Sequence, residues 1–494
     1  MKFVRYFIKN LRVSFFYPIF QIPNAVSFCD SNSVSFCDSN TAKPRDSKPQ
    51  THKSHNVYMF GSVKSLPEGL SKHPLLQRLE CKLVDFGPNF GVAVDKKSNV
   101  YLWGSDTQNE FVKPFLLCTL SNIKDLQCAN NEIYILLSNG TVLLIKDVND
   151  ILNTPHVNCV LQEIPEFSGG FLYNNPKIVR MSIGQYHSAF ISDDGSLYCS
   201  GNNEFGQCAQ KPTQLHTEST FLVYNNNTNT IDQIPPTKVR FRENVRIKDV
   251  VCGQTHTLCI DTNNNIYSFG DDSEIELFFG DSRGKSIFEH RHYKPYLKRI
   301  YNFSPINTSP IIYNQTEKHL QYVPVRINEM SLLKRYGELI RKSDIKLQAG
   351  NHFTIIAITP THSLHTVNNV NTNNSVNNVN NVNIVNRVNG VNNSIILSSG
   401  LNVSGQCGSL DPVSTAAKRV RISKPVRDLT CGTAHCFLLT NNSIYLWGDN
   451  KQKQLSLDKK TVWTPERLKL NPEEEIKYIK CSYNNSAIIT QHNQ

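Results

Sequence analysis

The chain has 494 residues, of which 39% are hydrophobic, and a net charge of +11. This apolar content is enough for a packed core, and no apolar run is long enough to cross a bilayer. The basic charge favours an acidic partner such as nucleic acid or an acidic protein face, although basic residues more often only solvate a surface.

Residues 1–50 differ from the rest of the chain. Four basic residues share one side of a predicted helix: Lys2, Arg5, Lys9 and Arg12. No acid precedes Asp30, and a basic amphipathic start of this kind is typical of a mitochondrial transit peptide. A secretory signal fits less well, because Pro18 interrupts the short apolar run. If the segment is instead a disordered tail, or if the start of the chain is assigned wrongly, we expect a nuclear or cytoplasmic protein.

One unit recurs through residues 51–494: an apolar strand, Gly-x-x-His, a second strand, a turn and a third strand that ends in Gly. The copies lie at residues 84–104, 126–146, 184–201, 250–270, 347–359 with 394–400, and 429–448. The copies at 84–104 and 126–146 are the weak ones. Self-similarity at a fixed period indicates a repeat architecture.

A polar corner follows the third strand in five copies. Counted from the closing Gly, position +2 is Asn or Asp and position +6 is Gln or Glu. The pairs are Asp106 and Glu110, Asn203 and Gln207, Asp272 and Glu276, Asn402 and Gln406, and Asn450 and Gln454. A short Asn or Asp side chain can bond nearby backbone and hold such a corner. The copy at 126–146 lacks this corner.

Each end of the repeat region carries half a unit. Residues 57–61 supply only a closing strand, and residues 476–490 supply only opening strands. Together they make one unit, which brings the count to about seven. Short strands at this period predict an all-β, seven-bladed propeller, closed by pairing of the N- and C-terminal strands.

The Gly-x-x-His opening and the corner resemble the regulator-of-chromosome-condensation repeat, which forms a seven-bladed propeller. The resemblance covers roughly residues 56–490 and is weakest around Ala129. A WD-repeat propeller fits worse, because Trp103 and Trp447 precede Gly rather than closing a Trp-Asp pair. A kelch propeller would need repeated Gly-Gly pairs, and the chain has only Gly169-Gly170.

Four histidines and four glycines are assigned to the same phase of different blades: His187, His256, His352, His435, Gly184, Gly253, Gly350 and Gly432. A catalytic histidine is needed once, so we interpret a repeated one as structural. The cysteines before these glycines and at the corners read as small core residues in a reducing compartment. We therefore expect no enzymatic site, no metal and no cofactor.

Residues 282–345 are predicted to be an insertion. Six basic residues mix with aromatics in its first part and form the predicted partner contact: Arg283, Lys285, Arg291, Lys294, Lys298 and Arg299. That mixture suits nucleic acid or an acidic protein face, and an inert loop is an equal alternative. Residues 328–342 predict a helix that Asn328 caps and whose buried face carries Met330, Leu333, Tyr336 and Ile340.

Residues 361–393 form a Val-Asn tract between the second and third strands of its blade, where we expect a functionless loop. A propeller is a platform, so fold alone does not give function. We predict a monomeric, non-enzymatic scaffold for a protein or nucleic-acid-associated partner. The alternative is a guanine-nucleotide exchange factor for a small GTPase, which the resemblance implies because the founding family member acts in this way on Ran.

Overall fold

The computed structural model describes residues 55–63, 76, 79–155, 159–164, 167, 175–211, 233–241, 243–278, 320–328, 333–361, 393–412, 417–422, 424–441 and 443–492. The chain divides into two units, residues 1–51 and 52–494, and all described residues belong to the second. The predicted targeting segment, the six basic residues at 283–299 and residues 362–392 of the Val-Asn tract lie outside the described residues.

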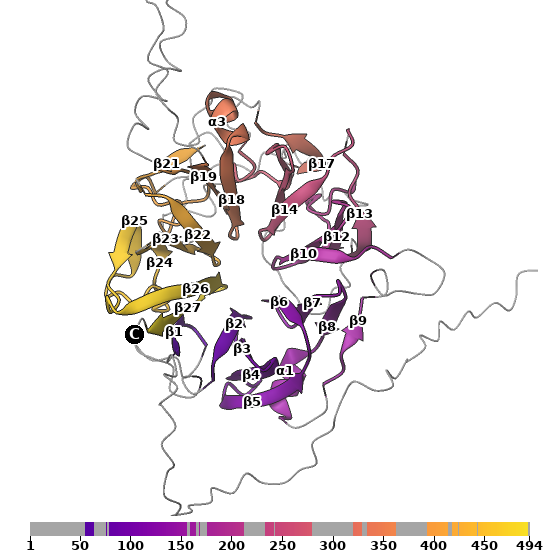
Figure 1. The fold of residues 1–494 in the computed structure, drawn as a ribbon, viewed down its shortest axis with the longest axis vertical. Helices are drawn as coiled ribbons and strands as arrows, with labels where there is room; N and C mark the ends of the chain where they lie inside the picture. Colours follow the sequence, from indigo (N-terminus) through magenta and orange to yellow (C-terminus); the bar gives the residue numbers. More distant parts are fainter. Residues whose placement is uncertain are drawn as a thin grey trace, which may run out of the picture. The chain divides into compact units, whose positions relative to one another are not determined.

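Seven sheets surround a common axis (Figure 1). The first strand of the sheet lies nearest to that axis in six of them, and β26 does so in the sheet that contains both chain ends. We number the sheets as blades in chain order. Blade 1 contains β2 (Cys81–Phe86), β3 (Phe90–Asp95), β4 (Asn99–Ser105) and β5 (Phe111–Thr119). Blade 2 contains β6 (Ile123–Cys128), β7 (Ile133–Leu137), β8 (Val142–Ile145) and β9 (Gln162–Glu163).

The next four blades repeat this antiparallel plan. Blade 3 contains β10 (Ile178–Ile183), β11 (His187–Ser192), β12 (Leu197–Asn202) and β13 (Gln233–Lys238). Blade 4 contains β14 (Ile247–Cys252), β15 (His256–Asp261), β16 (Ile266–Asp271) and β17 (Leu320–Arg326). Blade 5 contains β18 (Ser343–Ala349), β19 (Phe353–Pro360), β20 (Ile395–Gly400) and β21 (Lys418–Val420). Blade 6 contains β22 (Val426–Cys431), β23 (His435–Thr440), β24 (Ile444–Asp449) and β25 (Thr461–Leu468).

Blade 7 is built from both ends of the repeat region. Its strand order is β1 (His55–Gly61), β27 (Asn485–His492) and β26 (Glu474–Ser482), with Val57 opposite Ile489. This pairing confirms the predicted closure of the ring. Six of the seven sheets have four strands, and the described part of blade 7 has three.

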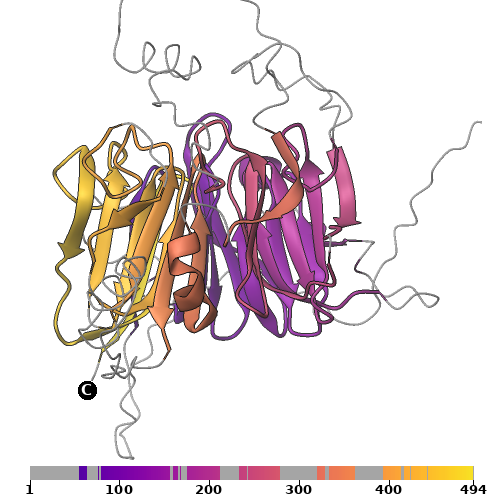
Figure 2. The ribbon, with the colours of Figure 1, turned by 90° about the horizontal axis from the view of Figure 1, so that it is seen from above.

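The second strands β3, β11, β15 and β23 are buried along their whole length. Each blade packs face to face with its two neighbours, so both faces of a central strand are covered (Figure 2). Such a strand needs apolar residues on both sides and reads as a continuous hydrophobic run. The core is therefore distributed around the ring, between blades.

Two glycines occupy positions where a side chain would collide with a neighbouring residue. The closing Gly201 has φ +109°, and a Cβ there would lie 2.7 Å from the Tyr186 carbonyl oxygen. Only glycine adopts this conformation at no steric cost. Gly91 lies opposite Trp103 in the adjacent strand, and a Cβ at Gly91 would lie 2.2 Å from the indole ring. The fully buried Trp103 thus occupies space that a side chain would fill.

Three segments depart from the repeat pattern, one each in blades 2, 4 and 5. The predicted insertion at 282–345 contains β17, so its later part belongs to blade 4. The Val-Asn tract falls between β19 and β20, as predicted. In blade 2, the helix α1 (Val148–Asn153) follows β8, where other blades place a corner.

The helix predicted over 328–342 is shorter in the structure. It consists of the 3₁₀ turn η3 (Lys334–Tyr336) and α3 (Gly337–Arg341), and Leu333, Tyr336 and Ile340 are buried as expected. The predicted cap is wrong, because Asn328 accepts a hydrogen bond from the Ile266 backbone N–H (2.6 Å) and donates to the Asn264 carbonyl (3.0 Å). None of the helices among the described residues is both long and apolar enough to cross a membrane.

Candidate functional site

We define the anchor position as the residue whose carbonyl accepts a hydrogen bond from the N–H that opens each repeat. It is the fourth residue of the Gly-x-x-His motif, as in Gly184 and His187 (2.9 Å). The anchor residues of blades 1 to 6 are Phe90, Glu132, His187, His256, Phe353 and His435. The same position therefore carries three different chemistries around the ring.

The anchor histidines bind the next blade. The Nε2 atom of His187 lies 2.7 Å from Thr257 Oγ1, that of His256 lies 3.0 Å from Thr354 Oγ1, and that of His435 lies 2.9 Å from Ser486 Oγ. Two of these hydroxyls donate onward to corner carbonyls, Thr257 to Gln207 and Ser486 to Gln454, both at 2.8 Å. Because those hydroxyls use their hydrogen for the carbonyl, the imidazole Nε2–H is the donor to them.

Burial lowers the pKa of each anchor histidine, His187, His256 and His435, to about 3. These imidazoles are therefore neutral near pH 7, and each serves as a fixed donor between blades. The three histidines occupy equivalent, buried positions, as the structural interpretation expects. We call the chain of histidine, hydroxyl and carbonyl the inter-blade relay.

The assignment of His352 to this set is wrong. The repeat reads Gly350-Asn351-His352-Phe353, and Phe353 pairs with the closing Gly400 as His187 pairs with Gly201. Phe353 is fully buried, whereas the His352 side chain is 21% exposed. One residue of displacement moves the imidazole out of the blade core and toward a neighbouring corner.

In each blade, the residue that directly follows the anchor has a side chain that suits the anchor of the preceding blade. Histidine anchors face Thr257, Thr354 and Ser486, whereas phenylalanine anchors share hydrophobic clusters with non-hydroxyl residues. Phe90 clusters with Ile133, and Phe353 clusters with Cys436. A buried donor needs an acceptor, and a ring needs none, so the two residues vary together.

The corners of blades 3, 4, 5 and 6 are held by their own side chains. The residue at +2 accepts a backbone hydrogen bond in each, for example Asn203 from Cys208 (2.9 Å) and Asp272 from Leu277 (3.0 Å). The residue at +6 accepts another, as Gln207 does from Phe205 (2.9 Å). These contacts confirm that the corner positions are structural.

The cysteines predicted to pack in the core do so. The six with an assigned repeat position are buried and free: Cys128, Cys208, Cys252, Cys407, Cys431 and Cys481. Burial raises the pKa of the Cys252 thiol to about 12, and it also raises the pKa of Cys128, Cys208, Cys407 and Cys481. A protonated, buried thiol is a poor nucleophile, so these cysteines have a packing role.

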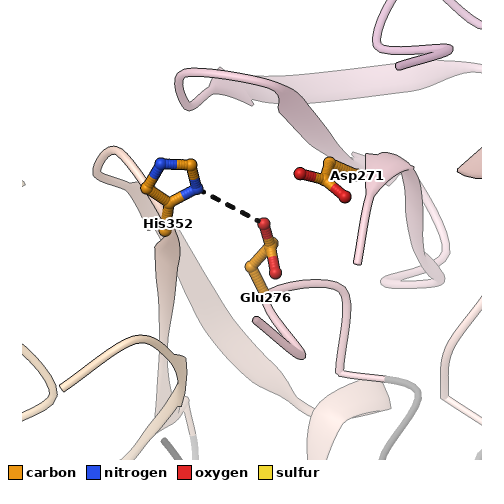
Figure 3. Close-up of side chains that lie close together, drawn as sticks. All are labelled: Asp271, Glu276 and His352. Atoms are coloured by element: carbon orange, nitrogen blue, oxygen red, sulfur yellow. Dashed lines mark ion pairs between the residues drawn. The ribbon is translucent and has the colours of Figure 1, made fainter. Parts of the chain in front are cut away.

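Blade 4 has a different corner. Asp271, Glu276 and His352 point toward one another across the junction of blades 4 and 5 (Figure 3). The Nδ1 atom of His352 lies 3.8 Å from Glu276 Oε1. Desolvation raises the pKa of Glu276 well above its ordinary value and also raises that of Asp271, because both carboxyl groups are buried. We call these three residues the carboxylate–histidine cluster.

The sequence did not predict this cluster, although it identified Glu276 as a corner residue. Glu276 stands at a corner position where blades 3, 5 and 6 have Gln207, Gln406 and Gln454. An acid in place of an amide at a buried position indicates a site with its own chemistry. His352 could not be added from the sequence, because its approach to Glu276 depends on how blade 5 packs against blade 4.

Blade 2 meets blade 3 across an open cleft. Its anchor is Glu132, and no corner motif follows β8. Ser188, which stands where Thr257 stands in the next blade, donates to the Ser200 carbonyl at 3.5 Å and also interacts with the Tyr134 side chain. A cleft of about 500 Å³ lies at this junction, and its lining includes Asn130, Glu132, Tyr134, Lys146, Gln185 and Ile234. We call it the inter-blade cleft.

The walls of the inter-blade cleft combine polar groups with apolar surface. Tyr134 donates a hydrogen bond to Glu132 (2.7 Å), which holds that carboxylate at the cleft wall. Lys146 is exposed at the rim, and Phe190 is buried behind the wall. A second, smaller cavity of about 70 Å³ lies among the repeat glycines, including Gly184, and is too small for more than a few waters.

Comparison with known proteins agrees with this architecture. Models of the regulator of chromosome condensation (RCC1) repeat match residues 194–260 and, separately, residues 178–207 and 247–274. The crystal structure of Prp20p from Saccharomyces cerevisiae, described with its binding to Gsp1p and histones, superposes with a TM-score of 0.57. It is 14% identical and covers 90% of this chain and 92% of that one, which shows a shared fold.

Several curated proteins are similar over part of the chain. The ultraviolet-B receptor UVR8 of Arabidopsis thaliana is 32% identical over 109 residues, 22% of this chain and 21% of UVR8. The human X-linked retinitis pigmentosa GTPase regulator is 28% identical over 120 residues, 24% of this chain and 10% of that protein. Protein FMP25, mitochondrial, of Saccharomyces cerevisiae is 24% identical over 208 residues, 38% of this chain and 34% of FMP25.

The matched part thus spans about a fifth or less of the first two of these relatives. The family-model matches fall on blades 3 and 4, both of which have histidine anchors. The stretch between residues 178 and 274 therefore carries repeats of the regulator of chromosome condensation type, within a seven-bladed ring that has the fold of Prp20p.

Proposed function

We propose that the protein is a non-enzymatic scaffold that binds a protein partner at the inter-blade cleft between blades 2 and 3. One observation carries the proposal: the cleft lies at the blade where the anchor histidine and the corner are both replaced. The histidines that suggested chemistry serve the inter-blade relay instead.

The chemistry of the cleft favours a peptide segment of a partner. Its lining offers carboxylate, amide and phenol groups together with Ile234 and Leu144. The neighbouring outer strand β9 has two residues, Gln162 and Glu163, which line the cleft, and it is the last strand of its sheet among the described residues. An extended segment can bind by adding to such an edge while its side chains enter an adjacent pocket.

A charge substitution at the cleft wall tests the scaffold proposal. Gln185 lines the cleft and follows the repeat Gly184, and Thr433 follows Gly432 in blade 6, away from the cleft. We expect Gln185→Arg to lose the partner captured by the tagged full chain and Thr433→Arg to retain it. Equal recovery by both variants, each with an unchanged melting temperature, would refute the cleft as the contact.

The alternative function is exchange of guanine nucleotide on a small GTPase. One similar protein supports it by name, the human X-linked retinitis pigmentosa GTPase regulator. The measurement is release of a fluorescent GDP analogue from purified small GTPases. Acceleration by the full chain would establish exchange, and an unchanged release rate with retained GTPase binding would favour the scaffold.

The predicted basic contact at Arg283, Lys285, Arg291, Lys294, Lys298 and Arg299 stays a proposal. If this segment binds nucleic acid, affinity should fall steeply with salt, by nearly one log unit per log unit of salt for each phosphate neutralised. Changing Arg291, Lys294, Lys298 and Arg299 to Glu should abolish that binding. Unchanged binding of nucleic acid and of protein by this variant would leave the segment without a contact role.

We propose mitochondrial import for the same chain. The basic start of the sequence supports it, as does the similarity to protein FMP25, mitochondrial. A fusion of residues 1–50 to a fluorescent protein should co-localise with mitochondria. A diffuse signal in cytosol and nucleus would contradict import and would make a nuclear or cytoplasmic role the better interpretation.

A further inference from the structure

The carboxylate–histidine cluster departs from the hydrogen-bonding pattern of its sister corners. In blade 3, Gln207 Nε2 donates to Asn202 Oδ1 (2.9 Å), and in blade 6, Gln454 Nε2 donates to Asp449 Oδ2 (3.2 Å). In blade 4 the corresponding pair is Glu276 and Asp271, and an amide N–H is absent from both side chains. Two buried carboxyl groups thus face each other where a donor normally lies between them.

One oxygen of Glu276 has no hydrogen-bond partner among the described residues. Glu276 is fully buried, its Oε2 accepts from the Glu274 backbone N–H (2.8 Å), and its Oε1 is left without a donor. That oxygen points to His352 Nδ1, which also lacks a hydrogen bond there (Figure 3). A buried oxygen without a donor is costly unless a cation or a proton occupies the site.

The remaining contacts fix the donors in place. Asp271 accepts from the Ser273 backbone N–H (3.0 Å) and from the Ser273 hydroxyl (2.9 Å). Such outer contacts orient the ligands of metal sites. The three donor atoms of the cluster lie within 4.8 Å of one another. Ligands of a tetrahedral zinc ion lie roughly 3.4 Å apart, so small side-chain rotations would close the set.

We propose that Asp271, Glu276 and His352 bind a divalent transition-metal ion, with Zn²⁺ as the expected occupant, at the junction of blades 4 and 5. An imidazole nitrogen with carboxylate oxygens suits Zn²⁺, whereas Mg²⁺ and Ca²⁺ prefer oxygen ligands alone. The ion would supply the positive charge that faces Glu276 Oε1. The partly exposed His352 gives the ion a path from solvent.

The proposal revises the expectation that the chain binds no metal, and it assigns a role to the displaced histidine. His352 belongs to blade 5, and both carboxylates belong to blade 4. A bound ion would therefore link two blades, as the inter-blade relay does elsewhere. Because the ion adds contacts to the folded state only, it would also stabilise the ring.

The experiment uses the full chain, stripped of metal with a chelator and titrated with ZnCl₂, MgCl₂ or CaCl₂. The metal content after dialysis is measured by mass spectrometry and the affinity by calorimetry. The substitution Glu276→Gln restores the residue of the sister corners, so we expect it to fold. We expect the wild type to retain one more zinc ion per chain than Glu276→Gln and His352→Asn, with weak binding of magnesium and calcium.

The matched control is Glu80→Gln, which removes an exposed carboxylate that pairs with Lys96 and lies outside the cluster. It should bind zinc as the wild type does. For the two cluster variants we expect at least about 100-fold weaker affinity at this site, since changes in outer contacts alone cost 10- to 100-fold. Equal zinc content in wild type, Glu276→Gln and His352→Asn would overturn the proposal.

Discussion

Blades 2 and 6 share one strand plan but meet their next neighbours in different ways. Blade 6 uses His435 to reach Ser486 in blade 7, and Ser486 returns a hydrogen bond to the corner of blade 6. Blade 2 has Glu132 at the same position and no corner, and its junction contains the inter-blade cleft. The comparison indicates that the repeated motif joins blades, and that its loss frees a surface.

The same comparison separates stability from binding. A residue repeated around the ring contributes a contact that each junction needs, whereas a departure from the repeat identifies a junction with another role. Two departures occur in the described residues, the cleft at blade 2 and the carboxylate–histidine cluster at blade 4.

The largest effect is expected from removal of residues 476–492, because blade 7 then loses both β26 and β27. The loss leaves β1 without its partner and exposes the faces of blades 1 and 6. We expect the cooperative thermal transition to disappear, as measured by circular dichroism. A chain without residues 1–50 should melt as the full chain does, and a cooperative transition in the truncated ring would show that closure is dispensable.

Acid should weaken the relay junctions. The pKa of His435 falls to about 3 in the folded state and is about 6.5 in the unfolded chain, so the unfolded chain binds more protons between these values. Stability is therefore full above pH 6.5 and is lost as the pH falls toward 3. At pH 4 the expected cost is roughly 3 kcal/mol for this histidine.

The buried carboxyl groups with raised pKa values have the opposite effect on stability in acid. The variant His435→Phe removes the titrating imidazole and leaves these carboxyl groups in place, so it isolates the contribution of His435. Phenylalanine occupies the same position in blade 5. Denaturant unfolding at pH 7 and pH 4 should show a smaller loss of stability in the variant than in the wild type. Equal losses would mean that His435 is not held neutral.

The substitution His435→Ala removes a buried ring and leaves the Ser486 hydroxyl without its donor. We expect it to lower the free energy of unfolding by about 2–4 kcal/mol. Glu132→Ala changes the same repeat position at a partly exposed site and should cost less than about 1 kcal/mol. Similar costs for both variants, from urea unfolding, would remove the distinction between the two junctions.

The smallest effect is expected from Glu132→His, which gives blade 2 the anchor of blades 3, 4 and 6. Ser188 is in place to accept from the new imidazole, as Thr257 does from His187. A gain of about 0.5–1 kcal/mol would reflect one net hydrogen bond. A loss of stability instead would show that the altered junction does not accept the relay.

The fold was predictable because each repeat carries its own strand and turn signals. The half units at residues 57–61 and 476–490 allowed closure to be predicted, and β1 pairs with β27 as expected. His352 was misplaced because a histidine beside Phe353 was taken for the anchor, although Phe353 keeps the apolar anchor position. Counting from the glycine would have separated the two.

The inter-blade cleft was not predictable, since a missing corner at blade 2 does not reveal what fills the space. Its walls come from blades 2 and 3, and only their packing brings Glu132 toward Gln185. The carboxylate–histidine cluster likewise joins residues of two blades. Sites between blades depend on contacts that a repeat pattern within one blade does not encode.

Hydrogen–deuterium exchange of the free, full chain tests the central claim most directly. The claim is that relay junctions are held more firmly than the junction at the cleft. Strand β23 follows the anchor His435, and β7 follows the anchor Glu132, so the two occupy the same place in their blades. Amides of β7 should exchange faster than those of β23 under native conditions. Equal exchange in the two strands, or slower exchange in β7, would contradict the account.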